Sequence, residues 1–147
     1  MSSASPPRFS DQDYRDILAY RDRLRRFLAW SESQAVAAGV TPAQHQLLLA
    51  VRGHAGAGRP TISDIAEHLC LQHHSAIGLI ARAVATGLVR RQPDHKDRRV
   101  VHIVLEPAGQ AALEHLTALH MIELGVLRDA SDAFESPSPT AMTSLGP

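Results

Sequence analysis

The sequence predicts a mainly helical protein with one small β-hairpin. Three observations predict this class: two long stretches near the ends carry apolar residues at helical spacing, three shorter helical stretches lie between them, and a β-branched run stands at 100–105. The length of 147 residues suits one domain with a core of its own. We therefore expect a single domain over 10–135, between tails at 1–9 and 136–147 that are expected to be disordered.

The first long helix is expected over 10–38. Ser10 and Asp13 have the spacing of a capping box, in which each side chain accepts a hydrogen bond from the backbone N–H of the other residue, and Gly39 ends the helix. The apolar positions of this helix are Tyr14, Ile17, Leu18, Leu24, Phe27, Leu28 and Val36. Several arginines between residues 21 and 26 are interpreted as a solvated face rather than as a nucleic-acid contact.

A second helix is expected to start after Thr41 and to stop near residue 53. Thr41 is the predicted N-cap, Pro42 takes the first helical position, and Gln44 completes another capping box. The residues expected to face the core are Leu47, Leu48 and Val51. A flexible, glycine-rich turn follows, and Thr61 and Ile62 are candidates for a short third strand.

Two shorter helices and a hairpin are expected next. The helices are Ser63–Leu69 and about Gln72–Thr86, with Gly87 past the second one, where a left-handed backbone is cheapest. The strands are Leu88–Arg91 and Val100–Leu105, and the turn at 93–99 carries three cations. Two helices at a steep angle followed by a basic hairpin form a winged helix-turn-helix. That shape places one helix in the DNA major groove and the hairpin tip over the minor groove.

The last long helix is expected to start at Pro107 and to reach about Leu127. Apolar residues surround much of its girth, so it needs burial on more than one side. The winged helix at 41–105 cannot supply that cover, whereas a second copy of the chain can. We therefore expect a homodimer with dimerisation helices at 10–38 and 107–135, in which 129–135 is either a short separate helix or a continuation of the long one.

The order of motifs resembles the MarR family of bacterial transcription regulators. The residues that carry the resemblance are Thr41-Pro42-Ala43-Gln44, Ile65-Ala66-Glu67-His68-Leu69, Gly87-Leu88-Val89-Arg90-Arg91, Asp97-Arg98-Arg99 and Pro107-Ala108-Gly109. They extend over roughly 14–127 without an internal gap. The resemblance implies a dimeric regulator that binds a palindromic operator, is a repressor, and is released by a small-molecule ligand.

The distribution of charge agrees with a double-stranded DNA partner. The whole chain carries 15 cationic and 15 acidic residues, but residues 59–99 have seven cations against four acids, while residues 105–135 have one cation against six acids. A polyanion would be attracted to the first segment and repelled by the second. The one cysteine excludes a disulfide within the chain, and the sequence has no apolar leader or membrane span, so we expect a cytoplasmic protein.

The start of the helix at 72–86 is predicted to contact base edges. Its candidate DNA-binding residues are Gln72, His73, His74, Ser75, Ile77, Gly78 and Arg82. Glutamine can pair with adenine at two points, and isoleucine can contact a thymine methyl. The resemblance places Arg82 at a phosphate; the alternative for Gln72 and Ser75 is helix capping. The residues at 72–78 depart from the family's usual ones, which suggests a different operator sequence.

The hairpin tip supplies the second predicted DNA contact. Asp97-Arg98-Arg99 matches the family's Asp-x-Arg, and arginine suits the narrow minor groove because its guanidinium loses water easily. We expect Arg99 to enter the groove, held in place by a charge-assisted bond to Asp97. Arg98 and Lys96 are expected to contact the backbone of the DNA.

The resemblance also implies a pocket for small aromatic or phenolic acids where the dimer helices meet the winged domain. The candidate lining residues are Trp30, His45, Leu49, Arg52 and His115. Each of them is also explained as an ordinary core or boundary residue.

The sequence also offers residues for metal sensing, redox sensing and protein docking, but each of these functions is less consistent with it than DNA binding. Metal sensing is suggested by His68, Cys70, His73 and His74, but adjacent side chains of a helix point apart, so no metal and no cofactor are expected. Redox sensing would use Cys70, which is expected to be a small buried thiol in the turn between the two helices. A protein-docking module would not need a basic wing. No enzyme is expected, since the sequence has no nucleophile elbow, P-loop, zinc-protease or dinucleotide motif.

Overall fold

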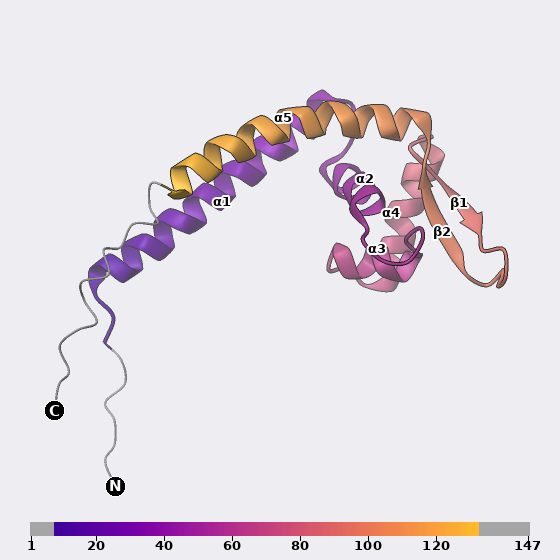
Figure 1. The fold of residues 1–147 in the computed structure, drawn as a ribbon, viewed down its shortest axis with the longest axis horizontal. Coiled ribbons are helices and arrows are strands. Elements are labelled where there is room, and N and C mark those ends of the chain that lie inside the picture. The colour runs from indigo at the N-terminus through magenta and orange to yellow at the C-terminus, as the bar shows by residue number, and fades with distance from the viewer. Residues whose placement is uncertain (1–7, 133–147) are drawn as a thin grey trace, which may run out of the picture.

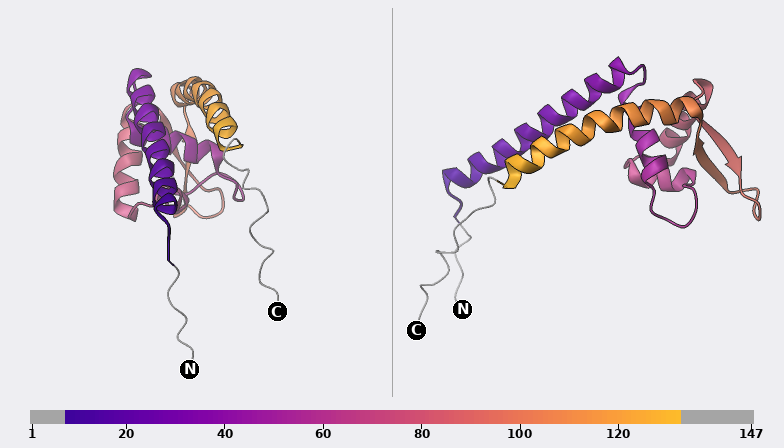
Figure 2. Two further views of the ribbon diagram at one scale, coloured as in Figure 1. Left: turned by 90° about the vertical axis from the view of Figure 1, so that its left-hand side faces the viewer. Right: turned by 45° about the horizontal axis from the view of Figure 1, so that its top comes forward.

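The computed structural model describes residues 8–132 and contains five helices and a two-stranded antiparallel sheet within them. The elements are α1 (Asp11–Ala37), α2 (Pro42–Gly53), α3 (Ile62–His68), α4 (His73–Ala85), β1 (Val89–Pro93), β2 (Val101–Leu105) and α5 (Pro107–Asp132). Helices α1 and α5 run side by side in opposite directions and extend away from the compact part formed by α2, α3, α4 and the hairpin (Figures 1 and 2). This is the mainly helical winged helix-turn-helix that the sequence predicts.

Local capping sets where the helices begin. The predicted capping boxes are present at Ser10 with Asp13 and at Thr41 with Gln44. A third box, which the sequence reading missed, joins Thr61 to Asp64 at the start of α3. The predicted third strand is therefore wrong for Ile62, the first residue of α3, and only Thr61 pairs with the hairpin, through an isolated bridge to His102.

The core lies where α2, α4, the hairpin and the start of α5 meet. Its largest fully buried side chains are Leu47, Leu48, Ile65, Ile80, Val89, Ile103 and Leu116. Each such side chain contributes about 1.5–3 kcal/mol by leaving water. Val51, predicted to face the core, is half-buried and packs against it. These contacts fix the orientation of α4 and of the hairpin on α2 and α5.

The hairpin register places alternate residues toward the core. Val89 pairs with Leu105 and Arg91 with Ile103, and both Val89 and Ile103 are buried. The strands differ from their predicted limits: β1 continues past Arg91 to Pro93, and β2 begins at Val101 rather than one residue earlier. Gln92 pairs with His102 and Pro93 pairs with Val101, so β1 extends two residues beyond Arg91.

Two further predictions are corrected in the connecting and terminal segments. Cys70 is exposed rather than buried, and its backbone is left-handed with φ of +51° because the turn from α3 to α4 bends there. Helix α5 does not end near Leu127 but continues to Asp132 as one helix, which agrees, as far as the described residues reach, with the continuous alternative for 129–135. Residues 1–7 of the tail predicted at 1–9, the whole tail predicted at 136–147, and residues 133–135 lie outside the described residues. Within residues 8–132, no helix is long and apolar enough to cross a membrane.

Candidate nucleic-acid interface

Helix α4 buries one face and exposes the other at its N-terminal end. Ala76, Leu79, Ile80 and Ala83 are buried against the core, which turns the opposite side outward. The predicted base-reading residues Gln72, His73, His74 and Ile77 are all exposed, and Ser75 and Gly78 are half-buried. The structure therefore gathers most of them at one exposed helix start, which is the geometry that a helix in the major groove needs.

The capping alternative for Gln72 does not apply in this structure. Gln72 is the N-cap residue of α4 by position, but its side chain makes no capping hydrogen bond. Arg82 lies farther along α4 and is exposed, and its guanidinium passes over Gly78, where an added Cβ would lie 3.4 Å from Nη1 of Arg82. The small residue at 78 thus leaves room for the arginine to fold back along the helix.

The β1–β2 hairpin is the wing, and residues 94–100 between its strands are the wing tip. The wing tip is held by two aspartates that accept hydrogen bonds from backbone amides. Oδ2 of Asp94 accepts from the N–H of Lys96 at 2.9 Å and of Asp97 at 3.1 Å. The hydrogen bond from the His102 side chain, followed by these two backbone bonds, lowers the pKa of Asp94 to about 2. The carboxylate is therefore ionised at neutral pH and acts only as an acceptor.

The contact predicted between Asp97 and Arg99 is present. Nε and Nη2 of Arg99 donate to the two carboxylate oxygens of Asp97 at 3.0 and 3.2 Å, and the Arg99 N–H donates to Oδ1 at 3.0 Å. These bonds to Arg99 lower the pKa of Asp97. The Arg99 side chain nevertheless remains 91% exposed, and Lys96 and Arg98 are exposed beside it. The tip presents an oriented guanidinium to solvent.

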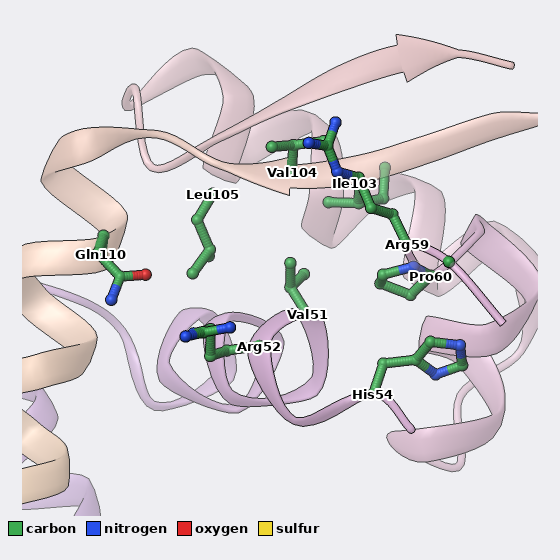
Figure 3. A pocket seen from close by; sticks show the side chains of 10 residues that line it. Val51, Arg52, His54, Arg59, Pro60, Ile103, Val104, Leu105 and Gln110 are labelled. Carbon is green, nitrogen blue, oxygen red and sulfur yellow. The ribbon is translucent and has the colours of Figure 1, made fainter. Parts of the chain in front are cut away.

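The five residues predicted to line a ligand pocket are distributed over several places. Trp30 and His45 meet at the junction of α1, α2 and α5, where the sequence reading missed His120. Arg52 lines a hollow of about 310 Å³ behind the wing, with Arg59 and Gln110 also at its wall (Figure 3). Leu49 borders a separate hollow next to His68. His115 is exposed on α5.

The junction of α1, α2 and α5 is an aromatic cluster around His120. The ring centroid of His120 lies 4.8 Å from Trp30, 4.9 Å from His45 and 5.9 Å from Phe27. Nδ1 of His120 donates to the carbonyl of Leu116 at 2.7 Å, since a carbonyl only accepts. Nε2 of the ring and the Ser31 hydroxyl oxygen are also 2.7 Å apart, within hydrogen-bond distance.

His45 has a buried polar atom without a partner. His45 is 3% exposed, and its Nδ1 has no hydrogen-bond partner among the described residues. Burial, and then the nearby His120, lower the pKa of His45, so the ring is held in its neutral form. An unpaired buried nitrogen of this kind costs about 1–3 kcal/mol, and a group that supplied the missing bond would recover that cost.

The histidines and the cysteine weighed for metal or redox chemistry are not brought together. Nε2 of His68 lies 2.9 Å from Nδ1 of His54, and Cys70 stands on the exposed turn that follows. Among residues 8–132 there is no group of three or more histidine, cysteine or acidic side chains placed to hold a metal ion. His73 and His74 belong instead to the exposed start of α4.

Comparison with known proteins finds similarity in sequence over the middle of the chain. Residues 38–100, which include α2, α3, α4 and β1, match the model of the MarR family. No curated protein matches this chain in sequence.

Solved structures of the family share the fold. A MarR family transcription regulator is 24% identical, with a TM-score of 0.70, covering 82% of this chain and 78% of its own. AbsC of Streptomyces coelicolor, a MarR family transcriptional regulator, is 21% identical with a TM-score of 0.67 over 88% of this chain and 94% of its own. MepR of S. aureus in complex with DNA is 20% identical, with a TM-score of 0.62, and the match covers 75% of this chain and 79% of MepR. At these identities the likeness establishes the fold.

Proposed function

We propose that this protein is a cytoplasmic homodimeric repressor that binds a palindromic duplex with α4 and the wing tip, and that a small aromatic acid releases it. The observation that carries the proposal is the pairing of an exposed reading face on α4 with an oriented, 91% exposed Arg99 at the wing tip. Both project from one core, so both can engage the same duplex.

The start of α4 and the wing tip contact different parts of the duplex because their side chains differ in chemistry. Gln72, His73 and His74 present donors and acceptors to base edges in the major groove. Arg99 enters the neighbouring minor groove, and the bidentate bond that it donates to Asp97 reduces the conformational freedom that the arginine loses on binding. Lys96, Arg98 and Arg82 supply charge to the phosphates.

The long helices support the dimer part of the proposal. In a single chain they expose large apolar side chains that a globular core would normally cover, and apolar side chains gathered in this number on two helices favour an interaction surface. On α1 these are Tyr14, Ile17, Leu18, Tyr20, Leu24, Leu28 and Val36, and on α5 they are Met121, Ile122, Leu124 and Val126. A two-fold pairing of the two arms covers these side chains and sets two wings on one duplex.

The DNA part of the proposal is tested with a duplex selected from a random pool, labelled with a fluorophore and titrated with the protein at several salt concentrations. Arg99→Ala removes one cation from each protomer, so the slope of log affinity against log salt should fall by about 1.8 for a dimer. The thermal midpoint should stay unchanged, since the side chain is almost fully exposed.

A matched control is Arg25→Ala on α1. Arg25 also forms an exposed ion pair, with Asp22 at 3.1 Å, but it lies on a long helix away from the wing. Its loss should leave the salt slope as it is. If Arg99→Ala binds the selected duplex with the affinity and salt slope of the wild type, the wing has no part in DNA binding.

The ligand part of the proposal places the aromatic acid at the junction of α1, α2 and α5, because rings line it and Nδ1 of His45 lacks a partner there. The chain has a single tryptophan, Trp30, which stands in this cluster and reports on it. Benzoate should shift the emission of Trp30 and weaken DNA binding over one concentration range. Weakened DNA binding without any change in Trp30 emission would place the ligand elsewhere.

A further inference from the structure

The side chain of His102, in the middle of β2, stands between two oxygen atoms from different parts of the chain. Its Nδ1 is 2.8 Å from the carbonyl oxygen of Arg59, in the loop before α3. Its Nε2 is 2.9 Å from Oδ1 of Asp94, at the start of the wing tip. A carbonyl oxygen only accepts hydrogen bonds, and so does an ionised carboxylate. Both bonds therefore form together only when both ring nitrogens carry hydrogen.

We propose that His102 acts as a positioning residue for DNA binding: its imidazolium form joins Asp94 to the carbonyl of Arg59 and thereby fixes where the wing tip carries Arg99. We call His102, Asp94 and the Arg59 carbonyl the wing clasp. The inference rests on the proposed DNA-binding function, and it adds a residue that does not itself contact DNA.

The clasp connects the tip to the body of the domain in a few steps. The carboxylate of Asp94 that binds His102 through Oδ1 also holds the tip amides of Lys96 and Asp97 through Oδ2. Asp97 in turn orients Arg99. The far end of the clasp, Arg59, is fixed in the loop, where its guanidinium donates to the side chain of Gln92 on β1.

The loop at the far end is itself anchored. The Ile103 N–H donates to the carbonyl of Pro60 at 2.9 Å, and Thr61 both pairs with His102 and caps α3. The tip is thus tied to the helix that packs on α4. When the proton on His102 is lost, one of the two oxygens faces a ring nitrogen that has only a lone pair, and one arm of the clasp opens.

The surroundings of the ring favour its charged form. Two charged groups face it: Asp94, from the end of β1, and Arg59, from the loop. The hydrogen bond to Asp94 and then the bond to the Arg59 carbonyl raise the pKa of His102 above its ordinary 6.5, against smaller opposing effects of burial and of the Arg59 charge. The closed clasp is therefore complete below pH 6.5 and is lost as the pH rises through the raised pKa.

The test compares two variants with the wild type in DNA-binding titrations across this pH range. In the wild type, log affinity should fall as the pH rises. The slope corresponds to the uptake of at most about one proton per protomer on DNA binding. His102→Gln should lower affinity and abolish the part of the pH dependence that comes from the clasp. Because α4 carries histidines of its own, the pH slopes are compared between proteins, not read from the wild type alone.

The decisive variant is Asp94→Asn. Its amide can donate to Nε2 of a neutral His102 while Nδ1 still donates to Arg59, and its remaining oxygen can accept from the amides of Lys96 and Asp97. The clasp then closes without the extra proton, so the pH slope should drop while the wing stays ordered. If Asp94→Asn and His102→Gln both keep the wild-type pH slope, the clasp does not control DNA binding.

A measurement without DNA separates this inference from the proposed function. In the NMR spectrum of the free protein, the ring of His102 should titrate above 6.5, and the amides of Lys96 and Asp97 should shift with it. Asp94→Asn should lower the pKa of His102 toward its ordinary value. If the free protein shows this titration but binds no duplex, the proposed function is contradicted and the wing clasp is not. If the tip amides do not shift as His102 titrates, the wing clasp is overturned.

Discussion

Gly109, in the first turn of α5, is the position where one added methyl group should do most harm. A Cβ built there falls well within 3.0 Å of the carbonyl oxygen of Leu88, lies 3.0 Å from the Leu88 carbonyl carbon and 3.1 Å from Cδ2 of Leu48. The same Leu88 oxygen accepts the N–H of Glu106 at 2.9 Å. The close approach therefore joins α5 to the residue just before β1, and both atoms on the Leu88 side belong to backbone.

The size of the effect follows from three contributions. Overpacking against backbone that cannot turn aside costs about 3 kcal/mol, at the upper end of the usual range. Loss or distortion of the bond from Glu106 to Leu88 adds about 1 kcal/mol. Alanine in a helix recovers at most about 1 kcal/mol relative to glycine. We expect Gly109→Ala to lower the free energy of unfolding by about 3 kcal/mol, a fall in thermal midpoint of roughly 10 °C.

The assay is thermal and urea unfolding followed by circular dichroism, at one fixed protein concentration because the stability of the proposed dimer would depend on it. The matched control is Gly125→Ala in the same helix, where an added Cβ meets nothing within 4 Å. That variant should gain up to about 1 kcal/mol. If Gly109→Ala is as stable as the wild type, or gains stability as the control does, then α5 does not pack on Leu88 as closely as described.

Three further outcomes are expected. Thr61→Ala removes the cap of α3 and should lower the free energy of unfolding by about 1 kcal/mol in urea titrations, and an unchanged midpoint would show that Asp64 needs no partner there. Ile122→Glu places a charge on a side chain that is 70% exposed in the single chain, and analytical ultracentrifugation should show a shift from dimer to monomer; a persisting dimer would move the interface elsewhere. On acidification, the tip amides of Lys96 and Asp97 should stay ordered at pH 3.8 and lose order as the pH falls through about 2, because the lowered pKa of Asp94 makes its bonds stabilising only while it is ionised. Order lost well above pH 3.8 in the NMR spectrum would contradict that assignment.

The sequence by itself determined the features that depend on neighbours along the chain. The capping boxes at Ser10 and Thr41, the left-handed glycines 39 and 87, and the pairing of Asp97 with Arg99 involve residues at most three positions apart or a single backbone angle. Interactions of this range are fixed by local geometry, so residue type and spacing are enough to predict them.

Only the tertiary structure decided which distant side chains meet. Ser31 and His120 bond across 89 positions of sequence, and His102 reaches a carbonyl 43 positions before it. Periodicity gives the face on which such a residue lies, but the contact also requires the angle at which two elements cross and the height at which they pack. For the same reason the predicted pocket residues Trp30, Leu49 and Arg52 lie apart.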